Sequence, residues 1–216
     1  MKKPTSVTTL DDLGRVRLSK TFFMRDFLYS EIGHFHGLSN VPDNPDAAIE
    51  AGTQLCENLL EPLQDRFGRL AIRSAYRSKE VNGFGNAQQK AKKSGYNCAS
   101  NEKNFAHHIW DERDRDSHLG ATVCLVVPSF IPLFEQGLSW KALAWWVHDN
   151  LPYSSMFFFP KNAAFNLRWS EVPEKRIDSF IQPDKGTLTK SGMANNVGDH
   201  SAHYSELLST ICGTNI

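Results

Sequence analysis

Two arginines four residues apart, Arg73 and Arg77, follow the short apolar run Leu70-Ala71-Ile72, with Tyr76 between them. A guanidinium is planar and permanently charged, so it can bind a carboxylate or a phosphate through two parallel hydrogen bonds. The apolar run predicts a strand, and the arginines stand at its end. This pattern indicates an anion-binding edge, with an exposed salt bridge as the plainer alternative.

A second stretch, residues 105–120, holds the densest set of ionisable side chains in the chain. The β-branched run 121–127 follows directly and ends at Pro128, which predicts a buried central strand. Functional sites are commonly built where polar side chains border such a scaffold. The candidates for acid-base or metal chemistry are His108, Asp111, Asp114 and His118. The alternative for residues 111–116 is a solvated turn of alternating charge.

The composition limits the class of protein that positions these residues. The chain has 216 residues, of which 40% are hydrophobic and 22% charged, as in an ordinary globular domain. Lysine plus arginine equals aspartate plus glutamate at 24 each, so nucleic acid is not an expected partner. No apolar run reaches the roughly 18 residues of a membrane span. The first residues lack the apolar core of a secretion signal, and we expect a cytoplasmic protein.

The four cysteines are scattered and form no Cys-x-x-Cys pair. This spacing argues against a zinc ribbon or a redox motif. We expect Cys56 to pack in the core and Cys98, Cys124 and Cys212 to be free thiols.

The apolar periodicity predicts an α+β fold, with a mostly antiparallel sheet of four or five strands and helices packed on it. Pro62 should kink the first long helix, and Gly68 should end it. The expected helices are 22–28, 46–67, 139–150 and one near 203–211; the expected strands are 70–72, 121–127, 155–159 and 165–169; the expected loops are 33–44 and 79–104, the second with one helical turn at 87–93. We divide the chain into an irregular segment 1–20, one domain 21–170 and a C-terminal extension 171–216.

The order of these elements and several short sequence motifs resemble those of the zinc D-alanyl-D-alanine carboxypeptidases and dipeptidases, which share a fold with the hedgehog signalling domain. The best parts are residues 22–28, residues 58–63 and the run 72–78 with Val81-Asn82 after it. In that family the corresponding strand ends in Ser-Gly-Tyr-Arg-Ser. The resemblance implies a short peptide-like substrate and places Arg77 on the arginine that contacts its terminal carboxylate. Arg73, Tyr76 and Asn166 are the other substrate-binding residues it indicates.

The zinc-binding residues of that family are substituted in this chain. The family uses a Ser-x-His-x-x-Gly-x-Ala-x-Asp motif, and when Gly120 is matched to it, Cys124 replaces the aspartate and Ser117 replaces the histidine, with His118 one place away. A second register matches residues 106–108 and keeps His108 as a ligand. Asn166 occupies the position of the later histidine. Residues 156–160 lack the catalytic glutamate.

Two explanations of these departures remain open. In the first, His108, His118 and Cys124 bind zinc at a relocated site, with Asp111 or Asp114 as the catalytic base. In the second, metal and peptidase activity are both lost, and the cleft, with Arg77 and the acidic stretch, binds a ligand or carries out other acid-base chemistry. Rival functions are a scaffold module, a phage structural component, or a nucleic-acid-directed enzyme with a basic groove made by Arg77, Lys90, Lys92, Lys93 and Arg113.

Two further sets of residues are weaker candidates. His148-Asp149 ends the expected helix 139–150, where a histidine most often interacts with the helix end. Asp199-His200-Ser201 has the residue types of a catalytic triad, but triads are assembled in space and not by adjacency in the chain. His200 could still fold over the cleft, and no role follows from the sequence for His203.

Overall fold

The structure, a computed structural model, describes the backbone of residues 1–213 and the side chains of residues 1–211, so the predicted free thiol of Cys212 lies outside the described residues. The chain forms two compact units. The first contains residues 1–57 and 74–123, and the second contains residues 58–73 and the chain from Cys124 onward. Our divisions at residues 20 and 170 follow sequence order, whereas both units are discontinuous in sequence.

The first unit begins with a helix that we did not expect. Residues 1–20 were predicted to be irregular, but α1 spans Val7–Gly14. The Ser6 hydroxyl accepts a hydrogen bond from the backbone N–H of Thr9, and the Thr9 hydroxyl accepts one from the N–H of Ser6. This reciprocal capping satisfies two backbone donors at the start of the helix, which explains why a short polar segment becomes helical.

The predicted helix 46–67 is confirmed, and a π-helical turn lies next to Pro62, where we predicted a kink. It consists of α3 (Pro45–Leu55), a π-helical turn (Cys56–Leu60) and α4 (Glu61–Phe67). Proline has no N–H for the carbonyl four residues earlier, and its ring would clash with that carbonyl. The wider π-helical turn before Pro62 accommodates both effects. Its apolar stripe is buried, including Cys56 and Leu63.

The predicted loop 79–104 is wrong over its first half, where α5 spans Lys79–Lys90. The Ser78 hydroxyl caps this helix by accepting from the N–H of Val81 at 3.2 Å. The buried face of α5 consists of Val81, Asn82 and Gly85, which are too small or too polar to give an apolar period. The unit also contains two shorter helices. These are α2 (Glu31–His36), which overlaps the start of the loop predicted at 33–44, and α6 (Asn101–Asn104).

The α+β class with a mostly antiparallel sheet is confirmed. The sheet has six strands in the order β1-β2-β4-β3-β5-β6. Strand β3 pairs antiparallel with β4 and parallel with β5, and β5 pairs antiparallel with β6. The strands are β1 (Ala71–Ser74), β2 (Gly120–Val126), β3 (Ser155–Phe158), β4 (Phe165–Ser170), β5 (Arg176–Ser179) and β6 (Gly186–Thr189). The last two come from the expected C-terminal extension, which therefore contributes to the sheet.

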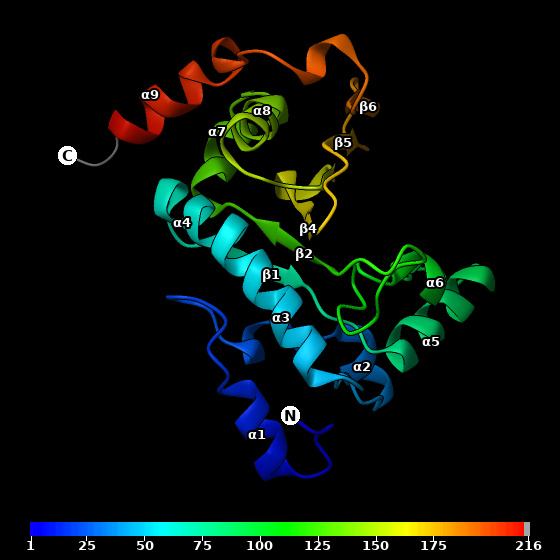
Figure 1. Cartoon of the computed structure of the whole chain (residues 1–216). Helices are drawn as coiled ribbons and strands as arrows, with labels where there is room; N and C mark the ends of the chain where they lie inside the picture. The colour runs from blue at the N-terminus through cyan, green and yellow to red at the C-terminus, as the bar shows by residue number, and fades with distance from the viewer. Residues whose placement is uncertain (214–216) are drawn as a thin grey trace. The chain divides into compact units, whose positions relative to one another are not determined.

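The helices of the second unit include α7 (Ile131–Glu135), α8 (Trp140–Asn150) and α9 (Ser205–Gly213). The ring of Trp140 on α8 lies 4.8 Å from that of Phe158 on β3. The segment that ends in the 3-10 helix Ser201–His203 packs along α8 together with α9 (Figure 1). None of the described helices is long and apolar enough to cross a membrane.

Candidate functional site

The end of β1 is joined to the polar stretch that precedes β2, and both parts belong to the first unit. The backbone N–H of Arg77 donates to the carbonyl of His108 at 2.7 Å. The Nδ1 atom of His108 lies 2.7 Å from the carbonyl of Ala75. Two residues that the sequence placed 31 positions apart are thus fixed side by side by their backbones.

The Arg77 guanidinium has only uncharged partners among the described residues. It donates to Sγ of Cys98 at 3.4 Å and to the hydroxyl of Ser74 at 3.3 Å, and the side chain is half-buried. No carboxylate of the described residues forms an ion pair with it. The exposed salt bridge that the sequence left open is therefore not formed by Arg77, and its charge is available to an anion.

His108 is buried, with 7% of its surface exposed. Because a carbonyl only accepts hydrogen bonds, the contact with Ala75 fixes the proton of the neutral ring on Nδ1. Nε2 has no hydrogen-bond partner among the described residues. Burial, followed by the nearby charge of Arg77, holds the pKa of His108 well below its usual range. At neutral pH this ring is uncharged and offers a lone pair at Nε2.

Asp111, one of the two predicted catalytic bases, is 6% exposed and holds three hydrogen bonds. Its carboxylate accepts from the backbone N–H groups of Asp43 at 2.8 Å and Asn44 at 3.3 Å, and from the hydroxyl of Tyr76 at 3.1 Å. Burial raises the pKa of Asp111 and the hydrogen bonds oppose that change. Burial and the charge of Asp111 raise the pKa of Tyr76 well above its usual range. Asp111 thus fastens its loop to the start of α3, as a structural residue would.

Asp114, the other predicted base, organises a turn. Its Oδ1 atom accepts from the backbone N–H of Asp116 at 3.0 Å and of His118 at 2.9 Å. The Nδ1 atom of His118 lies 3.6 Å from the same oxygen. These contacts fit the alternative of a solvated, charged turn at Asp114 and Asp116, whereas Asp111, where that predicted turn begins, is buried.

The remaining predicted residues belong to the second unit. Arg73 is exposed on β1, Cys124 is half-buried on β2, and Asn166 is half-buried on β4 opposite Phe157. The predicted metal ligands are therefore divided, with His108 and His118 in the first unit and Cys124 in the second.

A different group of side chains could hold a metal ion. Within the described part of the chain, one set of three His, Cys, Asp or Glu residues has its ligand atoms within 4.8 Å of one another, namely His148, Asp149 and His200. None of His108, His118 and Cys124 belongs to it. The geometry therefore gives no support to the predicted relocated ligand set, and it brings together residues that the sequence offered only as weak candidates.

Asp149 binds His200 in two ways. Its Oδ1 atom lies 2.6 Å from Nδ1 of the ring, and its Oδ2 atom accepts from the backbone N–H of His200 at 3.0 Å. The hydroxyl of Tyr204 also donates to Oδ2, at 3.1 Å. The indole of Trp145 stacks on the His200 ring with centroids 4.1 Å apart and planes 4° from parallel. The ring of His200 is thus held on its edge and on its face.

His148 is fixed from both ring nitrogens. Nδ1 lies 2.6 Å from the hydroxyl of Tyr153, and Nε2 lies 3.1 Å from the carbonyl of Asn196. Burial lowers the pKa of His148, and the hydrogen bond to Asn196 opposes that change. The sequence suggested a contact with the helix end; the structure shows contacts with Tyr153 and Asn196 instead.

The triad suggested by Asp199-His200-Ser201 is not formed. The hydroxyl of Ser201 donates to Asp199 at 2.9 Å, while His200 pairs with Asp149. The two partners are 51 residues apart, and no periodicity or motif connects them. The sequence therefore carries no specific signal for the Asp149–His200 pair, which is one of many possible combinations of an aspartate with a histidine.

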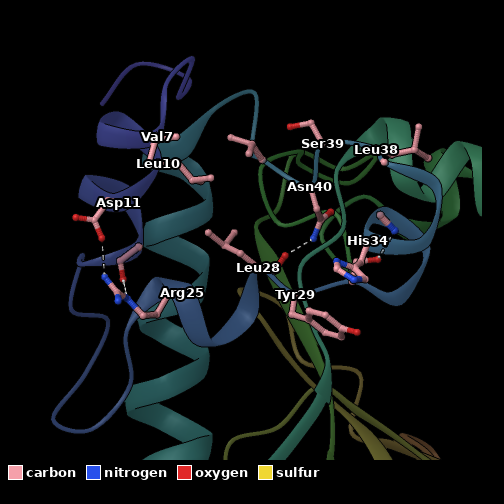
Figure 2. Close-up of a pocket in the computed structure, with 15 residues that line it drawn as sticks. Val7, Leu10, Asp11, Arg25, Leu28, Tyr29, His34, Leu38, Ser39 and Asn40 are labelled. Carbon is pink, nitrogen blue, oxygen red and sulfur yellow. Dashed lines mark hydrogen bonds and ion pairs between the residues drawn. The ribbon is translucent and has the colours of Figure 1, made fainter.

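Each unit contains a cavity, and only the cavity of the second unit borders one of these groups. The first, of about 680 Å³, lies beside α1 and is lined by side chains such as Leu10, Leu28 and Tyr29, with the Asp11–Arg25 ion pair at its edge (Figure 2). No predicted site residue is among those that line it. The second, of about 600 Å³, has His148 and Asp149 in its wall, together with Asn150, Lys175, residues 196–199 and Tyr204.

Comparison with known proteins does not identify the chain: no family model, no curated protein and no solved structure matches it.

Proposed function

We propose that the chain is a divergent relative of the zinc D,D-peptidases that recognises a short, peptide-like ligand through its terminal carboxylate, with Arg77 as the anchor. The observation that carries this proposal is Arg77, a half-buried residue whose guanidinium donates to the Cys98 sulfur and the Ser74 hydroxyl and to no carboxylate among the described residues. A guanidinium without an anionic partner gains from binding one. The family resemblance supports a carboxylate as that anion.

His108 supplies a second point of recognition. Its neutral ring is bound to the backbone at Ala75 and presents an unpaired Nε2. A lone pair beside a guanidinium suits a ligand that carries an N–H donor near a carboxylate, which is the arrangement at the end of a peptide. The hydrogen bond from the Arg77 N–H to the His108 carbonyl holds the two backbone segments together before the ligand arrives. Little conformational entropy of these segments is therefore lost when the ligand binds.

The family resemblance implies both recognition and hydrolysis of a peptide, and hydrolysis has less support from the residues present. His108 has the tautomer that a zinc ligand needs, but the set His108, His118 and Cys124 does not fit a zinc centre, because its members are not among the described residues whose ligand atoms converge. Asp111 is occupied by three hydrogen bonds within the protein. We therefore propose recognition of the ligand and derive no hydrolytic step.

The test is a binding titration of the full-length protein with N-acetyl-D-alanyl-D-alanine and with the same peptide as its C-terminal amide. We expect the free acid to bind and the amide to bind at least about ten-fold more weakly, since a charge-assisted bidentate contact contributes about 1.5–3 kcal/mol. Arg77→Lys keeps the charge but loses the fork, and it should weaken binding of the acid by about ten-fold.

Arg115→Lys is the matched control, because Arg115 belongs to the same unit but its side chain is 92% exposed and pairs with Asp116. It should bind the acid as the wild type does. Equal affinity of the wild type for acid and amide, or an Arg77→Lys variant with unchanged affinity for the acid, would contradict the proposal.

A further inference from the structure

The end of α8 and the segment before α9 bring three potential metal ligands together in the second unit. We propose that His148, Asp149 and His200 bind one divalent transition-metal ion, for which Zn²⁺ is the best-suited probe. Their ligand atoms lie within 4.8 Å of one another. His148 and His200 are 9% and 8% exposed, and the side chain of Asp149 is 15% exposed. The site is independent of Arg77 and of the proposed function.

The donor atoms select the class of metal. Two imidazole nitrogens and one carboxylate oxygen suit Zn²⁺ and its first-row neighbours. Ca²⁺ and Mg²⁺ prefer shells made mainly of oxygen. Three protein ligands leave the fourth position of a tetrahedral zinc ion open to water or to a ligand. The set therefore indicates a transition-metal ion with one exchangeable position.

The hydrogen bonds of His200 show where a metal ion fits. Nδ1 faces the carboxylate of Asp149 at 2.6 Å, and Nε2 faces the carbonyl of Asn195 at 3.1 Å. Both partners only accept, so both bonds form only when the ring carries two protons. A metal ion would replace the proton between Nδ1 and Asp149, and that proton would pass to solvent. Nε2–H would stay on the Asn195 carbonyl, as the outer nitrogen of a ligating histidine commonly does.

His148 offers its Nε2 atom to the same ion. Its Nδ1 faces the hydroxyl of Tyr153, a residue with no exposed surface. Nε2 faces the carbonyl of Asn196, and both His148 and Asn196 line the cavity of about 600 Å³. The Tyr153 hydroxyl can donate or accept, so it can receive Nδ1–H when Nε2 ligates. The cavity gives water and small ligands access to this side of the group.

The supporting contacts hold the ligands in place before any ion binds. Trp145 stacks on His200. Oδ2 of Asp149 is fixed by the N–H of His200 and the hydroxyl of Tyr204. A site whose ligands are locked by neighbouring contacts loses less entropy on binding. The ion would also tie the segment before α9 to α8, so binding should raise the thermal midpoint of the protein.

The test uses the full-length protein after chelator treatment and dialysis. Calorimetric titration with Zn²⁺ should give one equivalent with a micromolar or lower Kd and a higher Tm. Asp149→Asn and His200→Gln should each weaken binding by more than about ten-fold. His203→Gln is the matched control, because His203 lies in the same segment and stacks near Trp145 at 5.7 Å without belonging to the group; it should bind as the wild type does.

Co²⁺ provides a readout that does not depend on how well those variants fold. The wild-type Co²⁺ complex should lack a thiolate charge-transfer band, whereas His200→Cys, which replaces one zinc ligand by another, should bind Co²⁺ and show that band. No binding at micromolar free Zn²⁺, affinity that is unchanged in His200→Gln, or a thiolate band in the wild type would overturn the proposal. Each of these results leaves the carboxylate titration of Arg77 unaffected, so the two proposals fail separately.

Discussion

Replacing Asp111 distinguishes a structural role of this residue from a catalytic one, because its hydrogen bonds predict how much the free energy of unfolding should change. Asp111→Ala leaves three donors without their acceptor, the N–H groups of Asp43 and Asn44 and the hydroxyl of Tyr76. An unsatisfied buried donor costs about 1–3 kcal/mol. The Asn44 bond is long at 3.3 Å, and the variant no longer buries a carboxylate, so part of the cost is offset. We expect a loss of about 2–4 kcal/mol in the free energy of unfolding.

The assay is equilibrium unfolding in urea, monitored by tryptophan fluorescence, with the m-value compared between variants. Asp111→Asn keeps one acceptor oxygen but turns an amide toward a donor, so it should lose about 1–3 kcal/mol. Asp116→Asn is the control, since its side chain is 62% exposed and forms an ion pair with Arg115, whose side chain is 92% exposed. This variant should change stability by less than about 0.5 kcal/mol.

A loss of less than about 1 kcal/mol in Asp111→Ala, at an unchanged m-value, would refute the structural reading. If that same variant lost binding of the carboxylate ligand while remaining stable, Asp111 would be assigned a role in binding that ligand.

Two further predictions concern a helix and two tyrosines. A Cβ at Gly85 would lie 2.6 Å from Sγ of buried Cys98, whereas a Cβ at Gly83 on the same helix has no neighbour closer than 3.5 Å. Urea unfolding should show Gly85→Ala destabilised by about 1–3 kcal/mol and Gly83→Ala stabilised by about 0.5–1 kcal/mol. Equal effects of the two substitutions would argue against α5. Burial raises the pKa of Tyr76 and Tyr153 above the usual 10.0, so above that pH the unfolded chain loses protons that the folded chain keeps. The free energy of unfolding should then fall by about 1.4 kcal/mol per pH unit for each tyrosine. Tyr76→Phe and Tyr153→Phe should each reduce this fall when it is measured between pH 9 and about 11. A fall that is unchanged in both variants would contradict the raised pKa of the two tyrosines.

Local patterns in the sequence determined much of the secondary structure. The stripe of apolar residues in 46–67 and the proline within it predict a helix with an irregular turn, because helix periodicity and proline sterics act over a few residues. The β-branched run 121–127 and the short strands near 155 and 165 are local in the same sense. Where a helix buries small or polar side chains, as α5 buries Asn82 and Gly85, the sequence has no helical period of apolar residues, and a loop is predicted instead.

The candidate sites divide in the same way. Arg77 at the end of a strand, and a histidine in the polar stretch before the next strand, follow from the sequence, since a strand end presents its side chains wherever the strand lies. The uncharged surroundings of Arg77 and the three bonds of Asp111 depend on which segments meet. So does the group of His148, Asp149 and His200, in which hydrogen bonds join residues 51 positions apart. Partners at that separation are chosen by the packing of the C-terminal segment on α8, and only the tertiary structure decides them.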